Sequence, residues 1–209
     1  GTFSGCTGFN GELILPEGLE TIGESSFARC GFIGDLRIPD SVKVISSYAF
    51  NECSNFNGTL VLSENLESIG AYAFHSCGFT GDLRVPDSVQ SIEKYAFAWC
   101  KFDGLLTLSS NLVDLPEGTF AYCRGFHGDL IIPESVQYIE KEAFAYCNSL
   151  DGSLKLSSGL KRIGEGAFLN CQSLSGELII PNGVTDIGKY AFRNCSGFSG
   201  TLEIQGVVQ

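Results

Sequence analysis

The five residues Ala143-Phe144-Ala145-Tyr146-Cys147 decide how the chain folds. The same phrase of a small residue, Phe, two variable residues and Cys recurs along the whole sequence of 209 residues. Successive cysteines lie 23 or 24 residues apart. A constant period of this length is typical of a repeat array, in which each unit stacks on its neighbours to bury a continuous core.

The repeated Phe and Cys residues are the predicted structural core. They are Phe27, Cys30, Phe50, Cys53, Phe74, Cys77, Phe97, Cys100, Phe120, Cys123, Phe144, Cys147, Phe168, Cys171, Phe192 and Cys195. Neighbouring units would bring cysteine Cα atoms within disulfide distance. However, stacked side chains point the same way, and nine cysteines cannot all pair. We therefore expect a row of reduced, buried thiols, because free Cys behaves as a small hydrophobe.

Each unit contains two extended segments and one turn. The phrase Leu-x-Ile alternates as a strand does and ends at Pro or Ser, and Val-x-x-Ile follows as a second extended segment. The spacing of Ala-Phe-x-x-Cys predicts a tight 3₁₀ or single helical turn with Phe and Cys inward. A Gly precedes the first strand in every unit, as at Gly34 and Gly58. It indicates either a backbone conformation closed to other residues or a close backbone approach.

A second, longer period overlies the first. From Pro39 onward, units with Pro after the first strand alternate with units that have Ser there, such as Ser63. A block of about 47 residues, two periods long, therefore looks like the duplicated piece. The chain begins and ends inside a repeat and contains no Met. We expect one solenoid domain over residues 1–209, cut from a longer array.

Composition excludes several kinds of partner. The net charge of −11 argues against nucleic acid and against an anionic membrane surface, which both need clustered Lys and Arg. No apolar run approaches the roughly 20 residues of a membrane span, so we expect no membrane insertion by this part of the chain. We expect a monomer.

The last complete unit carries a family resemblance. Leu178-Ile179-Ile180-Pro181, Val184, Ile187-Gly188, Ala191-Phe192 and Cys195 resemble the BspA-like, or Treponema pallidum-type, leucine-rich repeat. The resemblance covers essentially the whole chain. It implies a right-handed, curved solenoid of β-rich α/β class, with about eight to nine repeats, one parallel sheet of short strands and little helix beyond single turns. It also implies a secreted or cell-surface setting and adhesion to host proteins.

Residues typical of catalysis do not converge in this sequence. His75 and His127 occupy different repeat positions, and each is expected to be a solvated surface residue. Carboxylates are plentiful, yet their spacing singles out no pair. A polysaccharide-degrading enzyme is therefore a remote alternative, and we predict no catalytic residue, no metal site and no cofactor.

Aromatic residues at the variable positions beside the repeated Phe form the first candidate ligand site. Two positions before Phe are Tyr48, Tyr72 and Tyr95, and two positions after it are Trp99, Tyr122 and Tyr146. Stacking of the units should turn these six residues into a staggered stripe, with Tyr95 and Trp99 as neighbours. Exposed Tyr and Trp are typical of protein or sugar recognition. The alternative is that the rings lie flat over loop backbone and seal an edge.

Charged residues on the first strand form the second candidate site. Asp35, Arg37, Asp82, Arg84 and Asp129 recur at related positions. They predict either a functional site, which is a charged ligand strip or a weak cation site, or a solvated face with modest ion pairs. The leading hypothesis is thus a non-catalytic recognition module that binds host protein or glycan. The alternative is a structural spacer that presents another domain.

Overall fold

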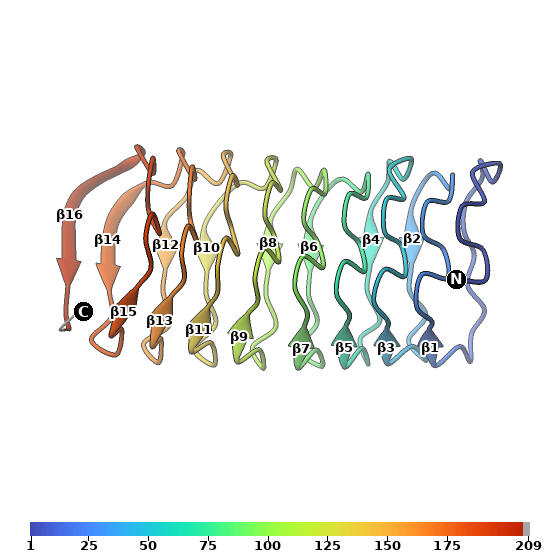
Figure 1. Cartoon of the computed structure of the whole chain (residues 1–209), viewed down its shortest axis with the longest axis horizontal. Coiled ribbons are helices and arrows are strands. Elements are labelled where there is room, and N and C mark those ends of the chain that lie inside the picture. Colours follow the sequence, from blue (N-terminus) through green and yellow to red (C-terminus); the bar gives the residue numbers. More distant parts are fainter. Residues whose placement is uncertain (207–209) are drawn as a thin grey trace.

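The computed structural model describes residues 1–206, which form 16 strands and no helix. The repeat units are rungs that lie side by side along the long axis, with the N-terminus at one end and the C-terminus near the other (Figure 1). The predicted solenoid of stacked parallel strands is confirmed.

The segment just before the turn forms one row of two-residue strands. They are β1 (Thr21–Ile22), β3 (Val44–Ile45), β5 (Ser68–Ile69), β7 (Ser91–Ile92), β9 (Asp114–Leu115), β11 (Tyr138–Ile139), β13 (Arg162–Ile163) and β15 (Asp186–Ile187). Strands of neighbouring rungs pair in parallel, in the orders β1-β3-β5-β7 and β9-β11-β13-β15. Their second residue points inward, as Ile45 and Ile69 do.

The Leu-x-Ile segment forms a second row. Its strands are β2 (Leu36–Arg37), β4 (Leu60–Val61), β6 (Leu83–Arg84), β8 (Leu106–Thr107), β10 (Leu130–Ile131), β12 (Leu154–Lys155), β14 (Gly176–Ile180) and β16 (Phe198–Ile204). They pair two by two, as β2-β4, β6-β8, β10-β12 and β14-β16. The single sheet implied by the resemblance is therefore replaced by two rows, because both extended segments pair between rungs.

Stacked phenylalanines form the centre of the core. Phe50 and Phe74 are fully buried with ring centroids 5.3 Å apart, and Phe97 and Phe120 stack at 5.6 Å. The predicted core is confirmed except near the two ends of the array, where Phe27, Phe192 and Cys195 are only partly buried. Stacked aromatic pairs each stabilise by about 0.5–1.5 kcal/mol beyond the area that they bury.

The cysteines use their thiols as hydrogen-bond donors. The Cys123 Sγ donates to the backbone oxygen of Phe97 in the preceding rung at 3.0 Å, and the Cys100 Sγ donates to Phe74 at 3.0 Å. All nine cysteines are free, and seven of them are buried. The repeat therefore needs Cys, since its side chain fills the core as a hydrophobe and also satisfies a buried carbonyl.

The 47-residue block corresponds to a physical module of two rungs, a Pro-type rung and the Ser-type rung after it. Inside a module the strands pair, and carboxylates bind the backbone of the next rung. The Asp35 Oδ1 accepts hydrogen bonds from the Thr59 N–H at 2.6 Å and from the Thr59 hydroxyl at 2.9 Å. The Asp129 Oδ1 accepts the Ser153 N–H at 2.7 Å.

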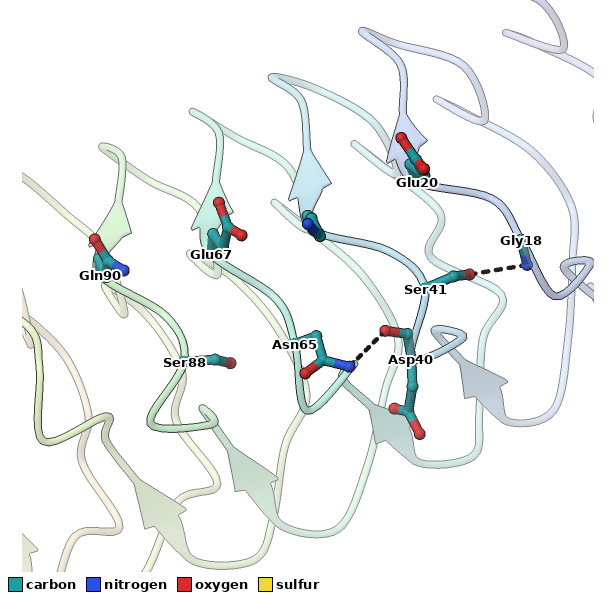
Figure 2. A pocket seen from close by; sticks show the side chains of 9 residues that line it. Gly18, Glu20, Asp40, Ser41, Asn65, Glu67, Ser88 and Gln90 are labelled. Atoms are coloured by element: carbon teal, nitrogen blue, oxygen red, sulfur yellow. Dashed lines mark hydrogen bonds between the residues drawn. The ribbon is translucent and has the colours of Figure 1, made fainter.

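The junction between one module and the next, here called a seam, is looser. In the described chain no strand of the second row pairs across a seam, as between β8 and β10. Figure 2 shows side-chain hydrogen bonds at the two junctions before a seam, Ser41 with Gly18 and Asn65 with Asp40. At the seam itself, the buried Ser88 hydroxyl has no partner among the described residues. The duplication seen in the sequence thus marks the unit of strand pairing in the second row, while the first row pairs across a seam, as β5 does with β7.

The glycine before the Leu-x-Ile strand, which belongs to the second row, meets the two predicted conditions in alternate rungs. Gly34, in a Pro-type rung, has a φ of 80°, which other residues rarely adopt. Gly58, in a Ser-type rung, has no room for a Cβ, which would collide with the Asp35 carboxylate and backbone. One repeat position is therefore fixed as glycine for two alternating reasons.

A proline interrupts the first strand row at one place. In the other rungs the residue after the strand donates its N–H to the preceding rung, as Glu93 does to Ile69 at 2.9 Å. Pro116 occupies this position after β9 and has no N–H to donate. The row is accordingly divided between β7 and β9.

Candidate recognition surface

The Ala-Phe-x-x-Cys segment forms a chain of tight turns. In one rung the N–H groups of Ala49, Asn51 and Cys53 donate three residues back, at 3.1–3.2 Å. The N–H groups between them donate to the next rung, as Phe50 does to Ala73 at 2.7 Å. This corrects the predicted 3₁₀ or helical turn, because alternate amides leave the rung to join its neighbour.

Left-handed residues stand on both sides of the repeated Phe. The upstream row, two positions before Phe, contains Ser25, Tyr48, Tyr72, Tyr95, Gly118, Glu142, Gly166 and Tyr190. The downstream row, two positions after Phe, contains Arg29, Glu52, Ser76, Trp99, Tyr122, Tyr146, Asn170 and Asn194. All have a φ between 52° and 63°. Left-handed backbone costs an L-residue roughly 1–2 kcal/mol. The backbone hydrogen bonds to neighbouring rungs must therefore hold these residues in place.

The two rows and the residues between them form what we call the turn face. On the upstream row, Tyr48 stacks on Tyr72 at 5.0 Å and Tyr72 stacks on Tyr95 at 5.1 Å, forming the upstream ladder. This ladder ends over Gly118, where a Cβ would collide with the Tyr95 ring. The Tyr95 hydroxyl donates to the Glu117 carboxylate at 3.0 Å, and burial together with this bond raises the pKa of Tyr95.

The downstream row carries a second ladder. Trp99 stacks on Tyr122 at 4.0 Å, and Tyr122 stacks on Tyr146 at 4.4 Å. The Arg124 guanidinium lies over the Tyr122 ring, 5.5 Å from its centroid. Trp99, at the start of this downstream ladder, is 49% exposed. The ladder therefore presents one open indole, two stacked phenols and a cation on a single strip.

The six predicted aromatic residues thus lie in two ladders on different rows, where a single stripe was expected. Tyr95 stacks on Tyr72 and Trp99 on Tyr122, so the two residues belong to separate stacks. For Tyr95 the contacts fit the edge-sealing alternative, since its ring covers Gly118. The sequence analysis missed Tyr190, an exposed member of the upstream row. Tyr190 lies two residues before Phe192, the same position by which Tyr48, Tyr72 and Tyr95 were predicted, so this spacing could have identified it.

A groove runs between the two rows over the first rungs. Its floor is formed by residues that directly follow the repeated Phe, namely Ser4, Ala28, Asn51 and His75. The cavity here measures about 360 Å³. Its charged wall is the ion pair of Arg29 with Glu52, whose Nε and Oε2 lie 3.0 Å apart. Arg29 lowers the pKa of Glu52 by this hydrogen bond.

His75 is not the solvated surface residue that the sequence predicts. Its ring meets Tyr72 edge-on at 5.4 Å, and its Nδ1 is buried without a hydrogen-bond partner among the described residues. Burial lowers the pKa of His75. His127 is exposed, as expected.

The charged residues of the second strand row serve mainly to join rungs. The carboxylates of Asp35, Asp82 and Asp129 accept backbone N–H groups from the following rung at 2.6–2.7 Å. The bonds from Thr59 lower the pKa of Asp35, and those from Ser153 lower the pKa of Asp129.

The two candidate arginines pair with other acids. Arg37 lies 3.6 Å from Asp40, and Arg84 pairs with Glu64. Neither arginine forms an ion pair with the aspartate two positions before it. The alternative of a solvated face with modest ion pairs therefore fits better than a ligand strip.

A wider hollow of about 610 Å³ lies elsewhere, beside the first strand row. Glu20 and Glu67 line it (Figure 2), and so does Lys43 between them in the sequence. Within residues 1–206, no three His, Cys, Asp or Glu side chains are grouped so that they could hold a metal ion. Nor do the described residues include a helix with the length and apolar character of a membrane span.

Comparison with known families identifies the repeat. The BspA type leucine rich repeat region matches in six copies, over residues 1–103 and 67–199. The chain therefore belongs to the BspA-type leucine-rich repeat family. No curated protein matches it in sequence.

Two solved structures share the architecture. A leucine-rich repeat protein from Bacteroides ovatus is 22% identical with a TM-score of 0.58, over 89% of this chain and 55% of the other. The pneumococcal vaccine antigen PcpA is 19% identical with a TM-score of 0.51, over 84% of this chain and 52% of the other.

A leucine rich cell surface protein from Faecalibacterium prausnitzii is 22% identical, with a TM-score of 0.48, over 98% of this chain and 62% of the other. The chain thus spans less than two thirds of each of these three proteins.

Proposed function

We propose that this chain is a non-catalytic recognition module of a secreted or cell-surface protein, and that its downstream ladder contacts a protein partner. The observation that carries the proposal is the ladder of Trp99, Tyr122 and Tyr146 with Arg124 above it. Trp, Tyr and Arg are the residues most enriched at the energetic centres of protein interfaces.

The position of the ladder supports recognition over packing. Its backbone places are left-handed, and the equivalent places in other rungs hold Ser76 and Asn170, so the fold does not require an aromatic ring there. The floor beneath, Ala98, Ala121 and Ala145, is almost completely buried. The core is therefore buried without the ladder, and the fold does not need the ladder to cover it. Trp99 keeps half of its surface exposed.

The alternative function is a structural spacer. The regular array of rungs, continuous from end to end in Figure 1, supports it. The carboxylate and strand hydrogen bonds that join each module also suit a stiff rod. A spacer gives no reason for an exposed Trp, so a partner that depends on Trp99 would favour recognition.

The test is a binding screen of this chain against host extracellular-matrix proteins by surface plasmon resonance. For a partner found there, Trp99→Ala is expected to weaken binding by about tenfold or more, the loss of about 1.4 kcal/mol or more that an interface Trp typically causes. The matched variant Trp99→Phe keeps a ring to stack on Tyr122 and should lose much less.

Circular dichroism and melting of both variants serve as the folding control. Trp99 stacks on one ring only, so both variants should fold. Equal affinities of the chain and of Trp99→Ala for the partner would reject the downstream ladder as the site. No binding to any protein in the screen would favour the spacer.

A further inference from the structure

The cavity over the first rungs lies between the two rows, on other rungs than the downstream ladder. One wall is the start of the upstream ladder, and the other is the pair of Arg29 and Glu52. Its volume of about 360 Å³ falls within the range of pockets that hold small ligands. None of its residues is needed for the protein contact proposed above, so its role is a separate question.

Tyr48 offers the cavity an open ring face. It stacks on Tyr72 on one side, but the row continues on the other side with Ser25, which is too small to cover a ring. Tyr48 is 39% exposed. An open aromatic face beside polar groups suits a ligand that has one non-polar face and a polar rim.

The polar groups of the cavity are pre-ordered and carry no net charge. Arg29 donates two hydrogen bonds to the Glu52 carboxylate, at 3.0 and 3.3 Å, and the Asn51 side-chain nitrogen donates to it at 3.2 Å. The two opposite charges cancel, so the cavity does not attract an ion by charge alone. The guanidinium, the amide and the carboxylate still have unused donors and acceptors for hydroxyl groups.

His75 adds a polar atom that lacks a partner. Its Nδ1 is buried and forms no hydrogen bond with the described residues. A buried polar group left unsatisfied is costly, and native proteins contain few of them. His75 lines the cavity with other atoms of its ring, and a rotation of the ring would open this nitrogen to a ligand hydroxyl.

We propose that this cavity binds a neutral pyranose unit, with the C–H face of the sugar on the Tyr48 ring and its hydroxyls on Arg29, Glu52 and Asn51. A pyranose has the required shape, with one face of C–H groups and a rim of hydroxyls. The cancelled charges disfavour an ionic ligand, and the polar floor disfavours a purely apolar one.

The test is a titration of the ¹⁵N-labelled protein with the methyl pyranosides of glucose, galactose and mannose, followed by NMR. We expect saturable shifts of the Tyr48, Asn51 and Glu52 amides with at least one glycoside, at a Kd of about 1 mM. Tyr48→Ala should weaken this binding by about tenfold or more, and Tyr48→Phe should retain it.

Tyr190→Ala is the matched control. Tyr190 occupies the same row with a similar exposure of 45%, but lies outside the cavity. Its replacement should leave the glycoside affinity unchanged. Absence of saturable shifts with all three glycosides overturns the proposal, as does unchanged affinity in Tyr48→Ala. Phenol producing the same shifts would show a site for any ring and would also overturn it.

Two further experiments separate this site from the downstream ladder and identify the source of the sugar. Trp99→Ala should keep glycoside binding even when it loses a protein partner, so the two proposals fail independently. A glycoprotein tested before and after removal of its glycans distinguishes an attached glycan from a free sugar. Binding of either form of pyranose supports the proposal.

Discussion

At the scale of the residue, this fold depends on side chains that accept an uncommon backbone. Within residues 1–206, fourteen residues other than glycine have positive φ, and all of them flank the repeated Phe. Non-glycine residues with positive φ are uncommon, and bulky ones are outliers. Tyr and Trp occupy seven of these places, where their stacking energy offsets part of the strain.

The strain should be measurable where no ladder is present. Ser76 has a φ of 57°, and the replacement Ser76→Gly is expected to raise the free energy of unfolding by about 0.5–1 kcal/mol. The matched variant Ser47→Gly is in ordinary backbone and should lower it by a similar amount, because glycine there only adds freedom to the unfolded chain. Chemical denaturation of both variants measures these two changes in the free energy of unfolding. Destabilisation by Ser76→Gly would contradict the strained backbone.

The thiols should respond to pH as buried groups. Burial raises the pKa of Cys53 to about 12 and that of Cys195 to about 11. The unfolded chain therefore ionises first. We expect the thiol contribution to the free energy of unfolding to be full below about pH 9 and to decline between about pH 9 and 12.

The rate at which each thiol reacts with a reagent reports the burial of that cysteine separately. At pH 8 the seven buried cysteines should react far more slowly with a disulfide reagent than the partly buried Cys6, because the reagent reaches a buried sulfur only after local opening. Mass spectrometry of the modified chain identifies the sites. Fast reaction of Cys123 in the folded protein would contradict a tightly packed row.

At the scale of the element, the rungs are joined alternately by strong and weak junctions. Asp35 and Asp129 hold the next rung inside a module, whereas at a seam the strands of the second row do not pair in the described chain. On the Ser-type side of a seam the leucines are slightly exposed, as Leu106 is, whereas Leu130 on the other side of the same seam is fully buried. Each seam is therefore the place where we expect local opening to begin.

Amide hydrogen exchange should reproduce this alternation. The N–H of Leu83 donates to Leu105 at 2.9 Å inside a module, and that of Leu130 donates to Ser153 at 2.9 Å. Both should be strongly protected, whereas the amides of Leu106 and Leu108 at the seam should exchange about tenfold faster or more. Equal protection along all rungs would contradict the modular account.

Much of this architecture could be predicted from the sequence, and the reasons are local. The Phe–Cys period and the Leu-x-Ile alternation are hydrophobic patterns, so they determine the inward side of every rung. The left-handed rows could not be predicted, because Tyr, Trp and Glu carry no signal for positive φ. His75 was misjudged for a related reason, since its burial depends on Tyr72 in the same turn and not on its own repeat position.

At the scale of the whole molecule, the strand faces and the turn face differ in the residues that they carry. The strand faces carry the carboxylates and ion pairs that join rungs, and the turn face carries the residues that differ from one rung to the next. Membership of the BspA-type family explains the core, and the ladders occupy positions that vary from rung to rung. The central claim is that recognition belongs to the turn face.

The most direct test of this claim compares one residue from each face against the same protein partner. Trp99→Ala on the turn face and Arg84→Ala on the strand face remove side chains of similar exposure, 49% for the whole Trp99 residue and 55% for the Arg84 side chain. Measured by surface plasmon resonance, the first should weaken binding by about tenfold or more and the second by less than about threefold. The reverse order would contradict the account.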